Sequence, residues 1–197
     1  MLALALTILL GAGWRVDGVV DGVKVELRDV EGSKFEEIRL TTTSAEPLQA
    51  LCDAVWAKGV KDGKEGDFKK RELIKETDTD RWTYEQIALP VVSDRDYVVH
   101  VQLLKPASSG ACEIAFQTED DPAHPTAPGH VRLKSVRGHW TLVPNEKGTV
   151  DITYLIFSDP GGSTPAFLSK GSQRKAAVDF LKTILKRAQA ARDAGTP

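Results

Sequence analysis

The sequence lacks several features that mark large classes of proteins. Its 197 residues include two cysteines, Cys52 and Cys112, too few for a disulfide framework or a four-ligand zinc site. Lys and Arg number 26 against 28 Asp and Glu, so no basic excess favours nucleic-acid binding, and no long run of like charge suggests a polybasic membrane tether. With 41% hydrophobic residues, the composition predicts one soluble globular domain.

Motifs for common chemistries are also missing. The sequence contains no phosphate-binding Gly-x-x-x-x-Gly-Lys-Ser/Thr, no dinucleotide-binding Gly-x-Gly-x-x-Gly, no Gly-x-Ser-x-Gly and no His-Glu-x-x-His. The four histidines are not spaced like metal ligands. His124 and His130 share one proline-rich stretch, but no carboxylate or thiol accompanies them at the spacing of a metal site. We therefore expect no cofactor, no metal ion and no activated nucleophile.

The first 13 residues, MLALALTILLGAG, carry no charged side chain. This stretch is shorter than the ~20 residues of a membrane-spanning helix, but it has the length of a secretory h-region and ends in small residues. We predict that residues 1–13 are a signal peptide, that the mature chain begins near Trp14, and that the protein is periplasmic or secreted. The lack of Lys or Arg before Leu2 leaves two alternatives: a buried N-terminal helix in a cytoplasmic protein, or a start further upstream.

Alternating apolar and polar residues predict strands over most of the remaining chain. Residues 48–55 instead have helical spacing, with Ser44 as the expected N-cap. Residues 119–129 hold three prolines and are predicted to be an irregular loop. The predicted strands are residues 23–27, 35–43, 70–77, 82–89, 96–105, 111–118, 131–143 and 149–157.

The period of the pattern changes near the C-terminus. Ser163 or Thr164 can cap a helix that has Pro165 in its first turn and runs to about residue 191, and residues 193–197 are expected to be a disordered tail. A curved antiparallel sheet with its helices on one side is an α+β architecture. A long helix across such a sheet can leave a hollow between the two layers, where we expect the functional site.

The two cysteines fall among apolar neighbours, on the helix of residues 48–55 and on the strand of residues 111–118. We expect both side chains to be buried. Whether they are free thiols or form a disulfide stays open, and export would favour the disulfide.

Residues 89–99, Leu-Pro-Val-Val-Ser-Asp-Arg-Asp-Tyr-Val-Val, resemble the Pro-x-x-x-x-Arg-Asp-Phe/Tyr-Val signature of the START domain family (steroidogenic acute regulatory protein-related lipid transfer). Residues 21–33 resemble the opening hairpin of that family, and residues 131–144 and 153–165 resemble its last strands and the approach to its C-terminal helix. The resemblance implies a helix-grip fold, in which the sheet wraps a long C-terminal helix around an internal hydrophobic cavity. It assigns residues 14–192 to one START-like lipid-binding domain.

Sterol-binding members of this family often pair an acidic residue on one strand with an arginine on the next. Glu85 matches the acidic position here, whereas the arginine position falls on Val101. Two members of the implied cavity have alternatives: Glu85 could lie on a solvated face, and Arg95 could anchor its strand. The resemblance implies a ligand cavity lined by Glu85, Arg95, Tyr97, Val99, Val101, Trp140, Tyr154, Phe167, Val178 and Leu181.

Three functions are compatible with these observations. The first is non-catalytic binding, and transfer, of a single lipid or other hydrophobic molecule by a monomer in transient contact with a membrane, since burial at ~25 cal/mol per Å² can hold such a ligand without any reaction. The second is a helix-grip enzyme such as a polyketide cyclase or aromatase, with Glu85, Tyr97 or His100 as acid or base. The third is a protein-binding module with a collapsed cavity.

Overall fold

The computed structural model describes residues 13–56, 68–88, 92–162 and 166–195, and for residues 166–170 it describes the backbone alone. The predicted signal peptide therefore lies outside the described residues, apart from Gly13. The described chain consists of β1 (Arg15–Val20), β2 (Val23–Asp29), β3 (Glu36–Ser44), α1 (Leu48–Trp56), β4 (Phe68–Glu76), β5 (Asp80–Ile87), β6 (Asp94–Lys105), the 3-10 turn η1 (Ala107–Ser109), β7 (Cys112–Glu119), β8 (His130–Arg132), β9 (Ser135–Pro144), β10 (Val150–Asp159) and α2 (Ala166–Asp193).

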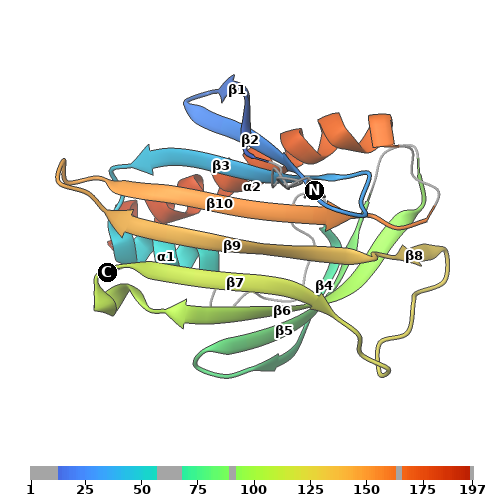
Figure 1. Ribbon diagram of the computed structural model, residues 1–197. Helices are drawn as coiled ribbons and strands as arrows, with labels where there is room; N and C mark the ends of the chain where they lie inside the picture. Colours follow the sequence, from blue (N-terminus) through green and yellow to red (C-terminus); the bar gives the residue numbers. More distant parts are fainter. Residues whose placement is uncertain (1–12, 57–67, 89–91, 163–165, 196–197) are drawn as a thin grey trace, which may run out of the picture.

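The strands form one curved sheet, in the order β1-β2-β3-β10-β9-β7-β6-β5-β4. All neighbours in this order are antiparallel, and β8 pairs in parallel with the start of β6. Figure 1 shows both helices on one face of the sheet, which we call the inner face. The predicted α+β architecture and the helix-grip arrangement are thus confirmed.

The structure adds β1 to the predicted strands and divides the predicted strand of residues 131–143 into β8 and β9. The break falls at Leu133 and Lys134, whose N–H groups leave the β9 ladder. The Leu133 N–H donates to the carbonyl of Asp96 at 3.0 Å, and the Lys134 N–H donates to the carbonyl of Asp159 at 3.2 Å. Periodicity alone could not show this break, because both halves are extended.

Two helix boundaries differ from the sequence-based expectation. Ser44 ends β3, and its hydroxyl accepts a hydrogen bond from the Glu46 N–H at 3.1 Å, so it closes a turn before α1 rather than capping the helix. Helix α2 continues to Asp193, and the Gly195 N–H then donates to the carbonyl of Arg192 at 2.9 Å. Gly195 has φ of 70°, the left-handed conformation that often ends helices.

The main hydrophobic core lies between the inner face and the two helices. Helix α2 contributes one stripe of buried side chains at helical spacing, Ala177, Val178, Leu181, Ile184 and Ala188. These pack with α1 and with side chains from β2, β3, β7, β9 and β10. Among residues 171–193 of α2, whose side chains the structure describes, the buried ones therefore lie between Ala177 and Ala188.

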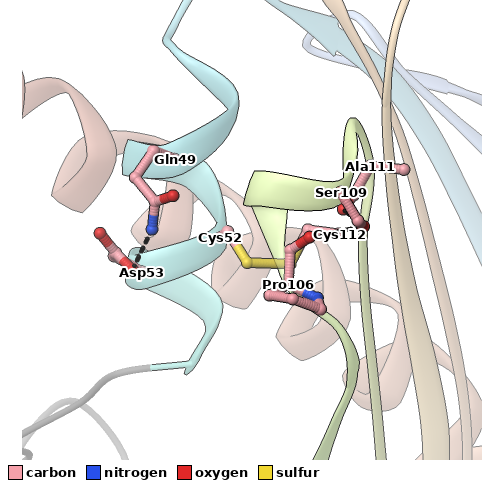
Figure 2. The surroundings of a disulfide bond; sticks show 7 residues. All are labelled: Gln49, Cys52, Asp53, Pro106, Ser109, Ala111 and Cys112. Atoms are coloured by element: carbon pink, nitrogen blue, oxygen red, sulfur yellow. Dashed lines mark hydrogen bonds between the residues drawn. A yellow bond between two sulfur atoms is a disulfide. The ribbon is translucent and has the colours of Figure 1, made fainter.

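A disulfide between Cys52 and Cys112 joins α1 to the start of β7 (Figure 2). Their Cα atoms are 5.9 Å apart, and both residues are buried in the main core. The expectation of buried cysteines is confirmed, and the open question of their pairing is answered in favour of the disulfide.

Candidate functional site

The candidate site lies on the inner face where β4, β5 and β6 run side by side. Along β5 and β6 successive side chains point to opposite faces, and the odd-numbered residues face inward. Tyr97, Val99 and Leu133 form a small buried cluster here, separate from the main core. Val101 and Phe116 pack against both clusters, so they connect the two.

Glu85 carries a carboxylate into this inner region. The residue is only 6% exposed, and three side chains donate hydrogen bonds to it. The Arg71 guanidinium reaches Oε1 at 2.8 Å, the Thr83 hydroxyl reaches the same oxygen at 3.1 Å, and the Tyr97 hydroxyl reaches Oε2 at 2.6 Å. The alternative in which Glu85 lies on a solvated face is wrong.

The arginine that pairs with Glu85 comes from the strand on its other side. Arg71 on β4 is directly opposite Glu85 on β5, and its side chain is 13% exposed. Val101, which occupies the expected arginine position, lies on β6 opposite Arg81. The chain therefore has the acid–arginine pair that the sequence seemed to lack, built from a different strand.

Burial and the neighbouring Glu85 carboxylate keep the Tyr97 hydroxyl protonated. Burial raises the pKa of the Tyr97 hydroxyl well above its usual value of 10, and the adjacent Glu85 charge and hydrogen bond raise the pKa further. The phenol therefore acts as a hydrogen-bond donor to Glu85 at any physiological pH.

A second buried cation, Arg81, connects the sheet to α1. Its guanidinium donates to the backbone carbonyl of Trp56 and lies 5.2 Å from the centroid of the Trp56 ring. Burial lowers the pKa of the Arg81 guanidinium below its usual value. The contact fixes the C-terminal end of α1 against β5.

The Arg95-Asp96 pair of the signature binds two loops, one on each face of the sheet. Arg95 is 2% exposed, and its guanidinium donates to the backbone carbonyls of Ser93, Pro160 and Gly161. These contacts hold the turn that precedes α2. The geometry matches the anchoring alternative for Arg95.

Asp96 acts on the outer face, opposite the helices. Its carboxylate accepts hydrogen bonds from the Tyr84 hydroxyl at 3.0 Å and the Ala127 N–H at 2.7 Å, and it forms an ion pair with Arg132 at 3.2 Å. The carboxylate thereby fastens the proline-rich loop of residues 120–129 over the sheet.

Four of the other predicted cavity residues belong to the main core. Trp140 and Tyr154 stack with ring centroids 3.9 Å apart, and Phe180 of α2 packs against both rings. Val178 and Leu181 lie in the buried stripe of α2. Phe167 is part of α2, but its side chain lies outside the described residues.

Sequence reasoning missed Arg71 and Thr83. The signal that could have found them is the register of the hairpin between β4 and β5, which places Arg71 opposite Glu85. That register contains irregularities between Leu73 and Lys75 and between Phe68 and Lys70, so a regular count from the turn would not have given this pair.

Two further findings concern the described residues only. None of their His, Cys, Asp and Glu side chains gather in groups of three or more that could hold a metal ion. No helix among them combines the length and apolar character needed to cross a membrane.

Comparison with known proteins places this geometry in a family. The family model of the START domain matches residues 43–193. An uncharacterized protein of Pseudomonas aeruginosa is 29% identical over 188 residues, covering 91% of this chain and 89% of the relative. The crystal structure of a STAR-related lipid transfer protein fragment from Xanthomonas axonopodis is 28% identical with a TM-score of 0.72, covering 90% of this chain and 99% of the other.

More distant structures share the fold alone. Human StAR-related lipid transfer protein 5 has a TM-score of 0.76 at 20% identity, covering 92% of this chain and 88% of the other. The Zhui aromatase/cyclase of a Streptomyces species has a TM-score of 0.53 at 13% identity, covering 79% and 94%. The family match spans most of the described fold, including α1, the sheet from β4 to β10, and α2. The chain therefore belongs to the START domain family.

Proposed function

We propose that this protein binds one lipid or other hydrophobic small molecule between the inner face of its sheet and α2, and carries it without reacting it. The observation that carries this proposal is the buried cluster of Glu85, Arg71, Thr83 and Tyr97. Tyr97 also belongs to the apolar cluster with Val99 and Leu133, which Val101 and Phe116 connect to the main core, so a polar group and an apolar surface lie next to each other on the inner face. An amphiphilic molecule matches that distribution.

The cluster favours a ligand that donates a hydrogen bond. Glu85 Oε2 accepts one hydrogen bond, from Tyr97, and a carboxylate oxygen can accept a second. The Tyr97 oxygen donates its only proton to Glu85 and keeps acceptor capacity. A hydroxyl or amide N–H of the ligand could donate a hydrogen bond to Glu85, whereas a ligand carboxylate or phosphate would be repelled by the negative charge of Glu85.

The second candidate is a cyclase-like enzyme, which the Tyr97–Glu85 hydrogen bond favours because such a pair can move a proton. Two observations weigh against it. Arg71 forms an ion pair with Glu85, so protonation of the Glu85 carboxylate would break this ion pair. His100, the third acid–base candidate, lies on β6 at an even position and faces away from Tyr97. The three groups are not assembled in one place.

Native mass spectrometry of the protein purified from its host tests the proposal. We expect a single bound species of lipid-like mass that is released unchanged by organic extraction. A polyketide-like molecule that the protein converts into a cyclised product would support the enzyme instead. A protein without any bound species, which also fails to take up lipid from vesicles, would contradict the lipid-binding function.

We also propose export, with cleavage before Trp14. The described domain already includes Trp14, whose ring lies 4.6 Å from the Arg28 guanidinium carbon and 4.3 Å from that of Arg39. A disulfide in the core supports an oxidising compartment. N-terminal sequencing of the protein from periplasmic or culture fractions should begin near Trp14, and a cytoplasmic protein that retains Met1 would contradict export.

Unequal burial along α2 leads to a prediction about ligand entry. Residues 171–176 include no buried side chain, whereas Val178, Leu181 and Ile184 are buried. Local opening costs less where little apolar surface is buried. Amide hydrogen exchange should be faster in residues 171–176 than in residues 178–185, and bound lipid should slow the faster segment. Uniform protection that ligand leaves unchanged would place ligand entry elsewhere.

A further inference from the structure

A hollow of about 280 Å³ opens on the outer face of the sheet, on the side away from α1 and α2. Ala115 of β7 lines the hollow and lies between Gln102 of β6 and His139 of β9, which line it as well. The methyl group of Ala115 leaves a gap among these larger side chains. Figure 1 shows the strands β6, β7, β9, β10 and β3 side by side here, with the helices behind them.

Arg137 stands at the rim of this hollow without a charged partner. Its guanidinium carbon lies 4.1 Å from the centroid of the Phe157 ring, which supports it from below. Among the residues that the structure describes, no hydrogen bond or ion pair involves the Arg137 side chain. A planar guanidinium stacked on an aromatic ring keeps its N–H groups available to a carboxylate, which it can bind through two parallel hydrogen bonds.

The carboxylates near the hollow are already engaged. His100 forms one wall; its Nδ1 lies 2.8 Å from Glu119 and its Nε2 lies 2.8 Å from Asp80. The imidazole is only 9% exposed and stacks on Trp82 with centroids 4.1 Å apart. These contacts hold the imidazole ring in place and engage both carboxylates with His100.

The remaining ionisable groups at the hollow are Glu37 and His139. Glu37 accepts a hydrogen bond from the Arg28 guanidinium at 2.9 Å. His139 has the Thr141 hydroxyl at 3.3 Å from Nδ1 and the carboxylate of Glu113 at 3.9 Å from Nε2. Among the described residues that line the hollow, Arg137 is therefore the charged residue whose side chain is available to a ligand.

We propose that this hollow is a second binding site, for a small organic carboxylate with an apolar body. The Arg137 guanidinium would bind the carboxylate, and Leu155 and the Ala115 methyl group would contact the body. The volume lies just below the ~300–1,000 Å³ of sites for drug-sized ligands, so it suits a metabolite-sized molecule. The site is separated from the proposed lipid region by the sheet itself and does not depend on the proposed function.

Benzoate is a suitable probe, and benzyl alcohol is its uncharged control. In ¹⁵N-resolved NMR spectra of the folded mature protein, benzoate should shift the amide signals of Ala115, Gly138 and His139 and saturate with a Kd of about 1 mM or tighter. Benzyl alcohol should produce no saturable shift there. Absence of saturation by benzoate, or equal binding of both probes, would overturn the proposal.

Two variants locate the site, and a third is the matched control. R137Q should weaken benzoate binding at least about tenfold, in line with the loss of a charge-assisted hydrogen bond. A115L should fill the hollow and abolish binding, while the native bound lipid remains. K186Q removes the same charge from an exposed position on α2 and should bind benzoate like the wild type. Equal weakening by R137Q and K186Q would mean that benzoate responds to net charge alone.

A capped Gly-Asp-Gly peptide distinguishes a free metabolite from an acidic side chain of a partner protein. We expect the peptide to bind more weakly than benzoate, because it lacks an apolar body for Leu155. A preference for the peptide would overturn the assignment to a small carboxylate. Displacement of benzoate by lipid would place the probe on the inner face and would also overturn it.

Discussion

Removal of the disulfide should lower the free energy of unfolding by about 4 kcal/mol. Cys52 and Cys112 are separated by 60 residues, and a cross-link that closes a loop of this length restricts the unfolded chain by about that amount in the chain-entropy account. At 2–4 °C per kcal/mol for a domain of this size, Tm should fall by roughly 10 °C. Urea unfolding of a C52A/C112A double variant against the oxidised protein measures the difference.

Reduction of the wild-type protein provides the control for this experiment. Wild type unfolded in reducing buffer should lose most of the same stability, and the reductant should leave the double variant unchanged. Because both sulfurs lie in the core, alanine leaves small cavities and adds somewhat to the loss. If oxidised wild type and the double variant unfold at the same urea concentration, the disulfide contributes nothing to stability.

The pairing of the two cysteines illustrates what sequence alone could reach. Apolar neighbours predicted that Cys52 and Cys112 are buried, and this is correct. Their pairing depends on where α1 crosses β7, and only the packed structure determines this. A helix stripe and a strand face each specify a direction for the side chain but not the partner that it meets.

For Arg95 and Asp96 of the signature, too, the sequence predicts the direction of each side chain but not its partners. Adjacent strand positions place the two side chains on opposite faces, and the structure agrees. The partners of Arg95 are carbonyl groups at Pro160 and Gly161, which have no side-chain signal in the sequence. Anchoring of Arg95 was one of two alternatives, and only the fold provided these carbonyls.

The irregular register between β4 and β5 explains why the sequence analysis did not find Arg71 as the partner of Glu85. The alternation of residues 96–105 correctly placed Tyr97, Val99 and Val101 on one face. The arginine of the acid–arginine pair was sought on β6, whereas it comes from β4. Because irregular register shifts the partners along a hairpin, a residue two strands from the signature could not be assigned to Glu85 by counting.

Substitution of Glu85 should produce the largest effect on ligand binding. E85K places a lysine beside Arg71 in a region that is 6% exposed, where an unpaired charge is costly. We expect it to lower the free energy of unfolding by about 3–5 kcal/mol, the range for breaking a buried ion pair, and to eliminate the bound species. E85Q keeps the shape and can still accept hydrogen bonds from Arg71 and Tyr97, so it should retain the fold and part of the binding.

The measurement is the fraction of ligand-bound protein in native mass spectra, together with urea unfolding of each variant. E146K, in the exposed turn between β9 and β10, carries the same charge change and should leave both quantities unchanged. Y97F provides a readout independent of charge: it removes the hydroxyl that donates to Glu85 and should reduce the bound fraction while costing about 1 kcal/mol of stability. If folded E85Q and Y97F both bind ligand like the wild type, the cluster does not contact the ligand and only stabilises the sheet.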